Sequence, residues 1–226
     1  MKVIILAGGQ ATRLTVSAKN MPKTLVKVAG QPILEHRLEW LKKHGLEDIR
    51  FSLGYLSEKM IKYLKGRYEY IVESESLGTG GAVKLASQDL TKDFMVMNGD
   101  ELADIDLTKF IQFHKEHSFA NSIVGRHHPD IRGWGFIKNQ GIEVRQYQEK
   151  PDIKRSGLIN TGVYIFSPKT FKSIKAKKFS TEYDISPKLA EQRQYAVFIH
   201  QGKWIGINTE EDVKIANQLW SPQKGN

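Results

Sequence analysis

Residues 3–9 of the chain read Val-Ile-Ile-Leu-Ala-Gly-Gly, and the stretch continues through Thr12 and Arg13 to a Pro-Lys pair that ends at Lys23. An apolar run bounded by glycines is typical of a central parallel strand that is buried on both faces. The two glycines allow the backbone to turn tightly and bring its N–H groups close to phosphate oxygens. Arg13 and Lys23 would add fixed positive charge. The stretch predicts a nucleotide-binding turn, with an ordinary strand-to-helix turn as the alternative.

The composition predicts one globular domain. With 226 residues, of which 40% are hydrophobic and 26% charged, the chain resembles soluble proteins that bury a sizeable core. We expect a single domain over residues 1–220 and a disordered tail over residues 221–226. No apolar run reaches the ~18 residues that cross a bilayer, and the first residues lack the pattern of a secretion signal. We therefore expect a cytoplasmic protein with no membrane partner.

Cysteine usage and charge exclude several classes of site. The chain has no cysteine, so disulfides, thiolate metal sites and a cysteine nucleophile are excluded. Its histidines, including His127 and His128, show no metal-ligand spacing. The net charge of +9 indicates affinity for anions. Because the basic residues are spread along the chain and form no basic arm or aromatic-interleaved strand, we expect no nucleic-acid partner.

The first 118 residues alternate between strand-like and helix-like patterns. Ile33, Leu38 and Leu41 share one face of a predicted helix that Gly45 ends. Strands are predicted near residues 3–7, 49–54, 70–72 and 94–97, and further helices over residues 60–64 and after residues 79–81. This alternation predicts an α/β fold with a mostly parallel sheet and helices on both faces.

The second half of the chain has shorter predicted strands, at residues 122–124, 135–137, 144–148 and 162–166. They indicate mixed or antiparallel strands that cover the site opened by the first half. Asp106 is expected to cap one helix, and Thr209 with Asp212 to form the capping box of the last helix.

Two polar segments stand at the ends of predicted elements. Asn98-Gly99-Asp100 closes the strand at 94–97, and ligands of open α/β sheets bind at such strand ends. Asp100 suits Mg²⁺, which binds through one or two carboxylates together with substrate phosphates, although it could be only a turn residue. The second segment, Leu77-Gly78-Thr79-Gly80-Gly81, enters a helix. Its backbone could face a planar base, with Thr79 offering a hydroxyl, or it could be only a helix start.

In order, the segments LAGGQATRL, PK, ESESLGTGGAV, NGDE, QEKP and NTGVYIF resemble those of the sugar-phosphate nucleotidylyltransferases, from residue 1 to about residue 216. The resemblance implies a Rossmann-like three-layer α/β/α fold with a mostly parallel central sheet and a smaller mixed-strand sugar-binding part. It also implies transfer of a nucleoside monophosphate from a nucleoside triphosphate to a hexose or heptose 1-phosphate, with Mg²⁺ as cofactor and release of pyrophosphate. The triphosphate and the sugar 1-phosphate would be the partners, and the family allows a homo-oligomer.

The resemblance assigns roles residue by residue. The catalytic residues would be Arg13, Lys23 and Asp100, and Asp100 would also hold the metal. The nucleotide would be bound by Leu6, Ala7, Gly8, Gly9, Thr12, Arg13, Leu77, Gly78 and Thr79. The sugar phosphate would be bound by Gly135, Glu149, Lys150, Asn160 and Gly162. Such a reaction needs no protein nucleophile, because it depends on positioning two anions and neutralising the charge that develops.

The chain departs from the family pattern at Gly206, where many relatives have an aspartate that gives the metal a second carboxylate. Metal binding would then depend on Asp100, phosphates and water, or on a nearby acid such as Glu101 or Asp104. The departure supports an alternative reading, a catalytically weak or inactive regulatory or scaffold protein. Retention of the other matched charged and polar residues favours the enzyme. The base and the sugar stay open.

Overall fold

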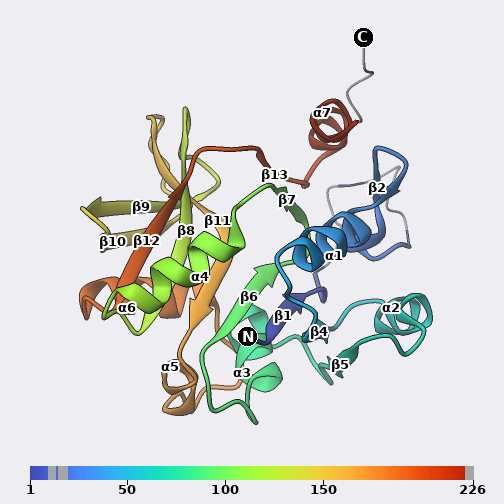
Figure 1. Ribbon diagram of the computed structural model, residues 1–226, viewed down its shortest axis with the longest axis horizontal. Coiled ribbons are helices and arrows are strands. Elements are labelled where there is room, and N and C mark those ends of the chain that lie inside the picture. The colour runs from blue at the N-terminus through green and yellow to red at the C-terminus, as the bar shows by residue number, and fades with distance from the viewer. Residues whose placement is uncertain (10–13, 15–19, 222–226) are drawn as a thin grey trace.

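The computed structural model describes residues 1–9, 14 and 20–221 (Figure 1). Among them, nine strands form one sheet in the spatial order β5-β4-β1-β6-β11-β8-β12-β10-β9. Their bounds are β1 (Val3–Leu6), β4 (Ile49–Leu53), β5 (Glu69–Val72), β6 (Phe94–Asn98), β8 (Asn121–His128), β9 (Gly135–Gln140), β10 (Glu143–Glu149), β11 (Gly157–Phe166) and β12 (Tyr195–His200). Helices alternate with the strands of the first half, and the predicted α/β class is confirmed.

The opening apolar run forms β1, in the middle of the parallel part of the sheet. Val3 lies opposite Ile49 of β4 on one side and Met95 of β6 on the other, in parallel pairings. Val3, Ile4 and Ile5 are completely buried. The run is therefore a central parallel strand, as its composition predicts.

The second half of the chain continues the same sheet. β11 runs antiparallel to β6, with Val163 opposite Met97, and β8 runs antiparallel to β11 but parallel to β12. Among the described residues the large sheet has four parallel and five antiparallel pairings, so the expected parallel order is limited to β5, β4, β1 and β6, with one further parallel pair between β8 and β12. The mixed strands extend the central sheet because β11 pairs along the edge of β6. Because both halves of the chain contribute strands to one sheet, we propose a single domain over residues 1–220.

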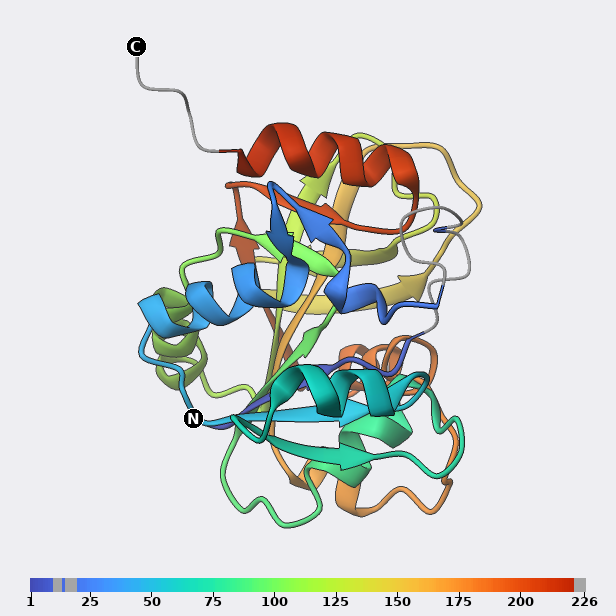
Figure 2. The same cartoon turned by 90° about the vertical axis from the view of Figure 1, so that its right-hand side faces the viewer.

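Helices cover both faces of the sheet (Figures 1 and 2). Val3 and Ile5 of β1 face a cluster that includes α1 (Ile33–Lys43), α2 (Ser57–Leu64) and α4 (Leu107–Glu116). Ile4 faces the opposite cluster, which includes α3 (Gly78–Ala86), α5 (Lys169–Lys172), the π-helix η2 (Thr181–Ile185) and α6 (Ser186–Glu191). The α3 helix begins before the glycines at 80 and 81, not after them as predicted.

A third apolar cluster joins the C-terminal helix to short strands beside the sheet. Its elements are α7 (Glu210–Trp220), β2 (Lys27–Val28), which pairs with β3 (Gln31–Pro32), and β7 (Glu101–Ala103), which pairs with β13 (Trp204–Gly206). The predicted capping box of α7 and the predicted Asp106 cap of α4 are both present. In the part of the chain that the structure describes, no helix combines the length and apolar character needed to cross a membrane.

Candidate active site

The carboxyl ends of β1 and β6 open onto two connected pockets. The smaller, of about 190 Å³, is lined by Leu6, Ala7, Gly9, Lys23, Thr24, Thr79, Asn98, Gly99 and Asp100. The larger, of about 450 Å³, is lined in part by Gly135, Glu149, Lys150 and Asn160. Thr79, Asn98 and Asp100 line both pockets. Four of the seven described residues predicted to bind nucleotide therefore line the smaller pocket, and four of the five predicted to bind sugar phosphate line the larger.

Four predicted site residues, Gly8, Leu77, Gly78 and Gly162, lie beside these pockets and not in their lining. A further cleft of about 680 Å³ borders α5 and α6, and none of its lining residues belongs to the predicted site. Thr12 and Arg13 lie outside the described residues.

The turn after β1 is packed at its first glycine and open at its second. A Cβ atom at Gly8 would lie 3.0 Å from the backbone nitrogen of Gly54, at the end of β4. A Cβ atom at Gly9 would meet no described atom within 4 Å, and Gly9 lines the smaller pocket. The backbone at Gly9 is therefore accessible to a ligand such as a phosphate group.

Lys23 points into the junction of the two pockets from the 3₁₀ helix η1 (Lys23–Leu25). Its ammonium group donates to Asp100 Oδ2 at 2.5 Å and to Asn208 Oδ1 at 3.0 Å. Asp100 follows Gly99, where a Cβ atom would lie 2.5 Å from the carbonyl oxygen of Leu6. A glycine is thus needed at 99 to bring the end of β6 against β1, and this packing places Asp100 beside Lys23.

Part of the predicted base-binding loop packs against another segment of the protein. The carbonyl oxygen of Phe179 accepts from the backbone N–H groups of Gly80 and Gly81, at 3.0 and 3.2 Å. A Cβ atom at Gly80 would overlap the Phe179 ring. These two glycines therefore serve close packing against the segment at Phe179, which leaves Leu77, Gly78 and Thr79 as the part of the loop nearest the site.

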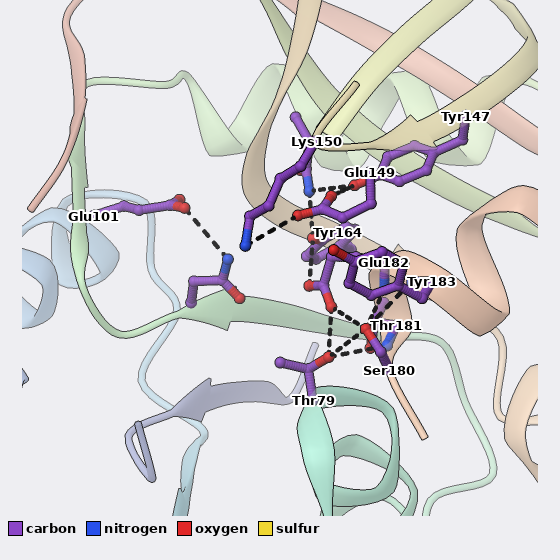
Figure 3. Close-up of polar contacts among 12 residues, drawn as sticks. Thr79, Glu101, Tyr147, Glu149, Lys150, Tyr164, Ser180, Thr181, Glu182 and Tyr183 are labelled. Carbon is purple, nitrogen blue, oxygen red and sulfur yellow. Dashed lines mark hydrogen bonds and ion pairs between the residues drawn. The ribbon is translucent and has the colours of Figure 1, made fainter. Parts of the chain in front are cut away.

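The Thr79 hydroxyl is bound within the protein instead of being free for a base. It donates to Glu182 Oε2 at 2.5 Å and accepts from the Thr181 backbone N–H at 2.9 Å. Glu182 Oε1 accepts from the Tyr164 hydroxyl at 3.3 Å. Figure 3 shows Glu182 between Thr79 and Tyr164, so one carboxylate connects α3 of the nucleotide side to β11 of the sugar side.

Glu149 ends β10 and Lys150 follows it, and both line the larger pocket (Figure 3). Glu149 accepts from the Tyr147 hydroxyl at 3.0 Å, and its Oε1 lies 3.8 Å from the Lys150 ammonium. Burial raises the pKa of Glu149 above its ordinary value. A Cβ atom at Gly135 would overlap the Tyr147 hydroxyl and lie 2.8 Å from Glu149 Oε2. Gly135 therefore makes room for these two side chains.

Asn160 lines the larger pocket, but its polar atoms already have partners. Its amide nitrogen donates to Tyr164 Oη at 2.6 Å and to Tyr147 Oη at 3.1 Å. Its Oδ1 accepts from the Gly162 backbone N–H at 2.8 Å. This arrangement fixes the irregular stretch of β11 between Asn160 and Tyr164, where the register against β8 shifts. Both amide N–H donors are taken within the protein, so Asn160 shapes the pocket wall.

Glu101 is the most deeply buried acid of the site, with 9% of its surface exposed. Asn98 Nδ2 donates to its Oε1 at 3.3 Å, whereas its buried Oε2 has no hydrogen-bond partner among the described residues. Burial raises the pKa of Glu101 to about 8, and the neighbouring Asp100 carboxylate adds to this effect. Without a cation beside it, the Glu101 carboxyl is therefore mostly protonated at neutral pH.

The described residues contain no group of three or more histidines, cysteines or acids that could hold a metal ion. Two oxygen atoms from distant segments, Asp100 Oδ2 and Asn208 Oδ1, nevertheless bind the same ammonium group. Oxygen donors of this kind, completed by phosphates and water, are the ligands that Mg²⁺ uses in nucleotide sites. The donor set at this junction fits a divalent cation bound jointly with a triphosphate.

Glu182 and Asn208 are site residues that were not predicted from the sequence. Glu182 comes from η2, and Asn208 lies between β13 and α7. Neither stands beside a glycine turn or at the end of a predicted strand, so no local signal singles them out. Both are placed by the fold.

Comparison with known proteins identifies the family to which the chain belongs. The family model described as "Nucleotidyl transferase" matches residues 2–219, and the chain belongs to this family. It is 32% identical over 224 residues to the mannose-1-phosphate guanylyltransferase catalytic subunit beta of Xenopus tropicalis, covering 94% of this chain. It is 33% identical over 226 residues to the mannose-1-phosphate guanyltransferase of Candida albicans, again covering 94% of this chain. The chain spans 62% of the length of these two relatives.

Solved structures resemble the whole fold. HddC from Yersinia pseudotuberculosis, in a complex with GMP-PN, superimposes with a TM-score of 0.84 at 31% identity, covering 97% of this chain and 99% of HddC. A putative glucose-1-phosphate thymidylyltransferase from Bacillus anthracis superimposes with a TM-score of 0.89 at 22% identity, covering 100% of this chain and 97% of that one. At 22% identity, the similarity to the Bacillus anthracis protein supports the fold alone.

Proposed function

We propose that this chain transfers a nucleoside monophosphate from a nucleoside triphosphate to a sugar 1-phosphate and releases pyrophosphate. The observation that carries the proposal is the pair of connected pockets that meet at Lys23 and Asp100. One pocket is lined by the turn after β1, and the other by acids that can accept hydrogen bonds from sugar hydroxyls.

In the proposed reaction, an oxygen of the sugar phosphate attacks the α-phosphorus in line with the departing pyrophosphate. Lys23 stabilises the charge that develops on the phosphate oxygens, and the accessible backbone at Gly9 contributes N–H donors. Glu149 and Lys150 orient the sugar phosphate from the opposite wall. Mg²⁺, held at Asp100, would supply further charge neutralisation when bound.

We further propose guanylyl transfer to mannose 1-phosphate or a related hexose or heptose 1-phosphate. Support comes from relatives that are named mannose-1-phosphate guanylyltransferases and from the similarity to HddC, which was solved with GMP-PN. The loop around Leu77 and the walls near Gly135 would make the choice of base and sugar.

The test is pyrophosphate release with Mg²⁺ across GTP, UTP, dTTP, CTP and ATP, each combined with mannose, glucose, N-acetylglucosamine and heptose 1-phosphates. We expect strong release with GTP and one of these sugars, and its loss in Lys23→Ala. Strong release with another base would overturn the guanylyl assignment and leave the reaction class intact.

The second candidate, a weak or inactive regulatory or scaffold protein, is supported by Gly206. Release of no pyrophosphate in any combination, with nucleotide binding retained by calorimetry, would favour it. The cytoplasmic location and the homo-oligomer stay predictions, and sedimentation of the purified chain tests the latter.

A further inference from the structure

The larger pocket has an aromatic wall at Trp134. Among the described residues that line this pocket, only Trp134 and Tyr183 are aromatic, and the others are polar or glycine. Tyr183 is 60% exposed, whereas Trp134 is partly buried and packs against the core. A sugar carries hydroxyl groups around the edge of its ring and C–H groups on its faces, so its site needs an apolar surface beside the polar groups. Trp134 is the anchored side chain that offers this surface.

The backbone of Trp134 is fixed beside Lys150, the residue proposed to orient the sugar phosphate. The Trp134 carbonyl oxygen accepts from the Lys150 N–H at 3.0 Å, and the Trp134 N–H donates to the carbonyl oxygen of Ile131 at 3.2 Å. Gly133 has a φ of +81°, a conformation that favours glycine, in the turn that leads into β9. This turn therefore places Trp134 next to Lys150 at the pocket wall.

The ring of Trp134 is held by other rings behind it. It packs edge-on against Trp204, with ring centroids 5.0 Å apart, and its centroid lies 5.9 Å from that of the His128 ring. Trp204 is itself buried, and its indole N–H donates to the carbonyl oxygen of Thr161 at 3.2 Å. The Trp134 ring is therefore preorganised, and a ligand that packs on it need not order it.

Gly206 leaves the space that the Trp134 ring occupies. A Cβ atom at Gly206 would lie 3.1 Å from Cη2 and 3.2 Å from Cζ3 of Trp134. Both distances are shorter than the optimal carbon–carbon separation of about 3.5–4.0 Å. A side chain at position 206 would therefore push against a ring that Trp204 and His128 hold in place. The departure from the family pattern at Gly206 thus has a packing reason.

We propose that the sugar ring of the sugar 1-phosphate packs on the Trp134 ring, and that position 206 is glycine because this ring fills the space in front of it. The sugar is then held by three kinds of contact: its phosphate at Lys150, its hydroxyls at the Glu149 carboxyl, and its C–H face at Trp134. This inference rests on the proposed function, because it names the residue that contacts the sugar ring in the same site.

The test measures binding to the full chain by isothermal titration calorimetry. Mannose, glucose, N-acetylglucosamine and heptose 1-phosphates are titrated alone and with a GTP analogue whose α and β phosphates are joined by a methylene group, so that no turnover occurs. For the sugar that the wild type binds most tightly, Trp134→Leu removes the ring and is expected to weaken binding about tenfold, whereas Trp134→Phe retains a ring and should bind within about threefold of the wild type. The GTP analogue should bind both variants like the wild type. Trp220→Leu, at the end of α7 and outside the lining of both pockets, is the matched control and should bind the sugar normally.

A double-mutant cycle tests the role of Gly206. Gly206→Ala is expected to weaken sugar binding severalfold by displacing the Trp134 ring, and to have no further effect in the Trp134→Leu background.

Several outcomes overturn the proposal. They are sugar binding by Trp134→Leu within about twofold of the wild type, an equal loss in Trp134→Phe or in Trp220→Leu, and an equal loss of the GTP analogue. A Gly206→Ala effect that persists without the Trp134 ring also overturns it, because it would act through another neighbour such as Asn208. In each of these cases the wild type still binds sugar and releases pyrophosphate, so the proposed function stands. A wild type that binds none of the four sugars overturns this inference together with the sugar assignment.

Discussion

At the scale of single residues, Lys23 has the most direct role in the proposed reaction. Its ammonium lies where the two pockets meet, 2.5 Å from Asp100. Loss of one preorganised charged donor lowers turnover by roughly 10² to 10³. We therefore expect Lys23→Ala to lower kcat for pyrophosphate release by about that factor. The exposed Lys27 provides the control, since Lys27→Ala should retain wild-type turnover. Equal activity of both variants would remove Lys23 from the mechanism.

The buried Glu149 predicts a pH dependence of stability. Burial raises its native pKa above the ordinary value of 4.5. The native protein then keeps this proton to a higher pH than the unfolded chain, so the free energy of unfolding falls as pH rises from about 4.5 to the native pKa. Glu149→Gln cannot ionise and escapes this loss. We expect the Tm of the variant minus that of the wild type to be near zero below pH ~4.5 and to become positive above it. A difference that is constant with pH would contradict this account.

At the scale of elements, two glycines of neighbouring strand ends should respond differently to the same substitution. A Cβ atom at Gly99 would lie 2.5 Å from the Leu6 carbonyl oxygen and 2.6 Å from Thr24 Cγ2, whereas a Cβ atom at Gly9 would meet no described atom within 4 Å. Overpacking of this kind costs typically ~1–3 kcal/mol. Gly99→Ala is therefore expected to lower the unfolding free energy by about that amount in urea titrations. Gly9→Ala should retain stability but weaken nucleotide binding, and a comparable loss of stability in both variants would refute the contrast.

One carboxylate of η2 contacts both α3 and β11. Glu182 accepts from Thr79 of α3 and from Tyr164 of β11. Removing it leaves the hydroxyls of Thr79, Tyr164 and Ser180 without this acceptor. Glu182→Ala should therefore raise KM for both substrates, whereas Glu191→Ala, at the exposed end of α6, should change neither. Steady-state kinetics with each substrate varied in turn measures this, and a change confined to one substrate would contradict the bridging role.

Local patterns predict the first half of the fold well, and the second half less well, for a physical reason. The runs that form β1, β4 and β6 are apolar and are flanked by segments with helical periodicity. Their burial can therefore be predicted from residues that are close in the sequence. β11 begins at Gly157, five residues before its predicted start, because its first part pairs with β8 and β9. Asn208 and Glu182 reach the site only through β13 and η2, and such long-range placement leaves no periodic signal.

At the scale of the whole molecule, the net charge of +9 needs an explanation that does not involve nucleic acid. Several of its cations are already matched by acids: Lys2 pairs with Asp48 and Arg50 with Asp89. The cations that line the pockets, Lys23, Arg132 and Lys150, face the proposed phosphates. The cations are thus divided between surface ion pairs and one anion-binding site.

This division of charge predicts weak binding to double-stranded DNA. A nucleic-acid protein loses affinity steeply with salt because it releases counterions from many phosphates. For this chain, fluorescence anisotropy with a labelled duplex should show no saturation below ~10⁻⁴ M at physiological salt, whereas GTP should compete for whatever binding appears at low salt. Duplex binding that GTP does not displace, and whose salt dependence corresponds to several phosphate contacts, would instead indicate a second anion-binding surface on the molecule. The described cations outside the pockets are scattered over many elements, so we expect GTP to displace the duplex. This outcome would indicate that the positive charge of the chain serves to bind its phosphate-bearing substrates.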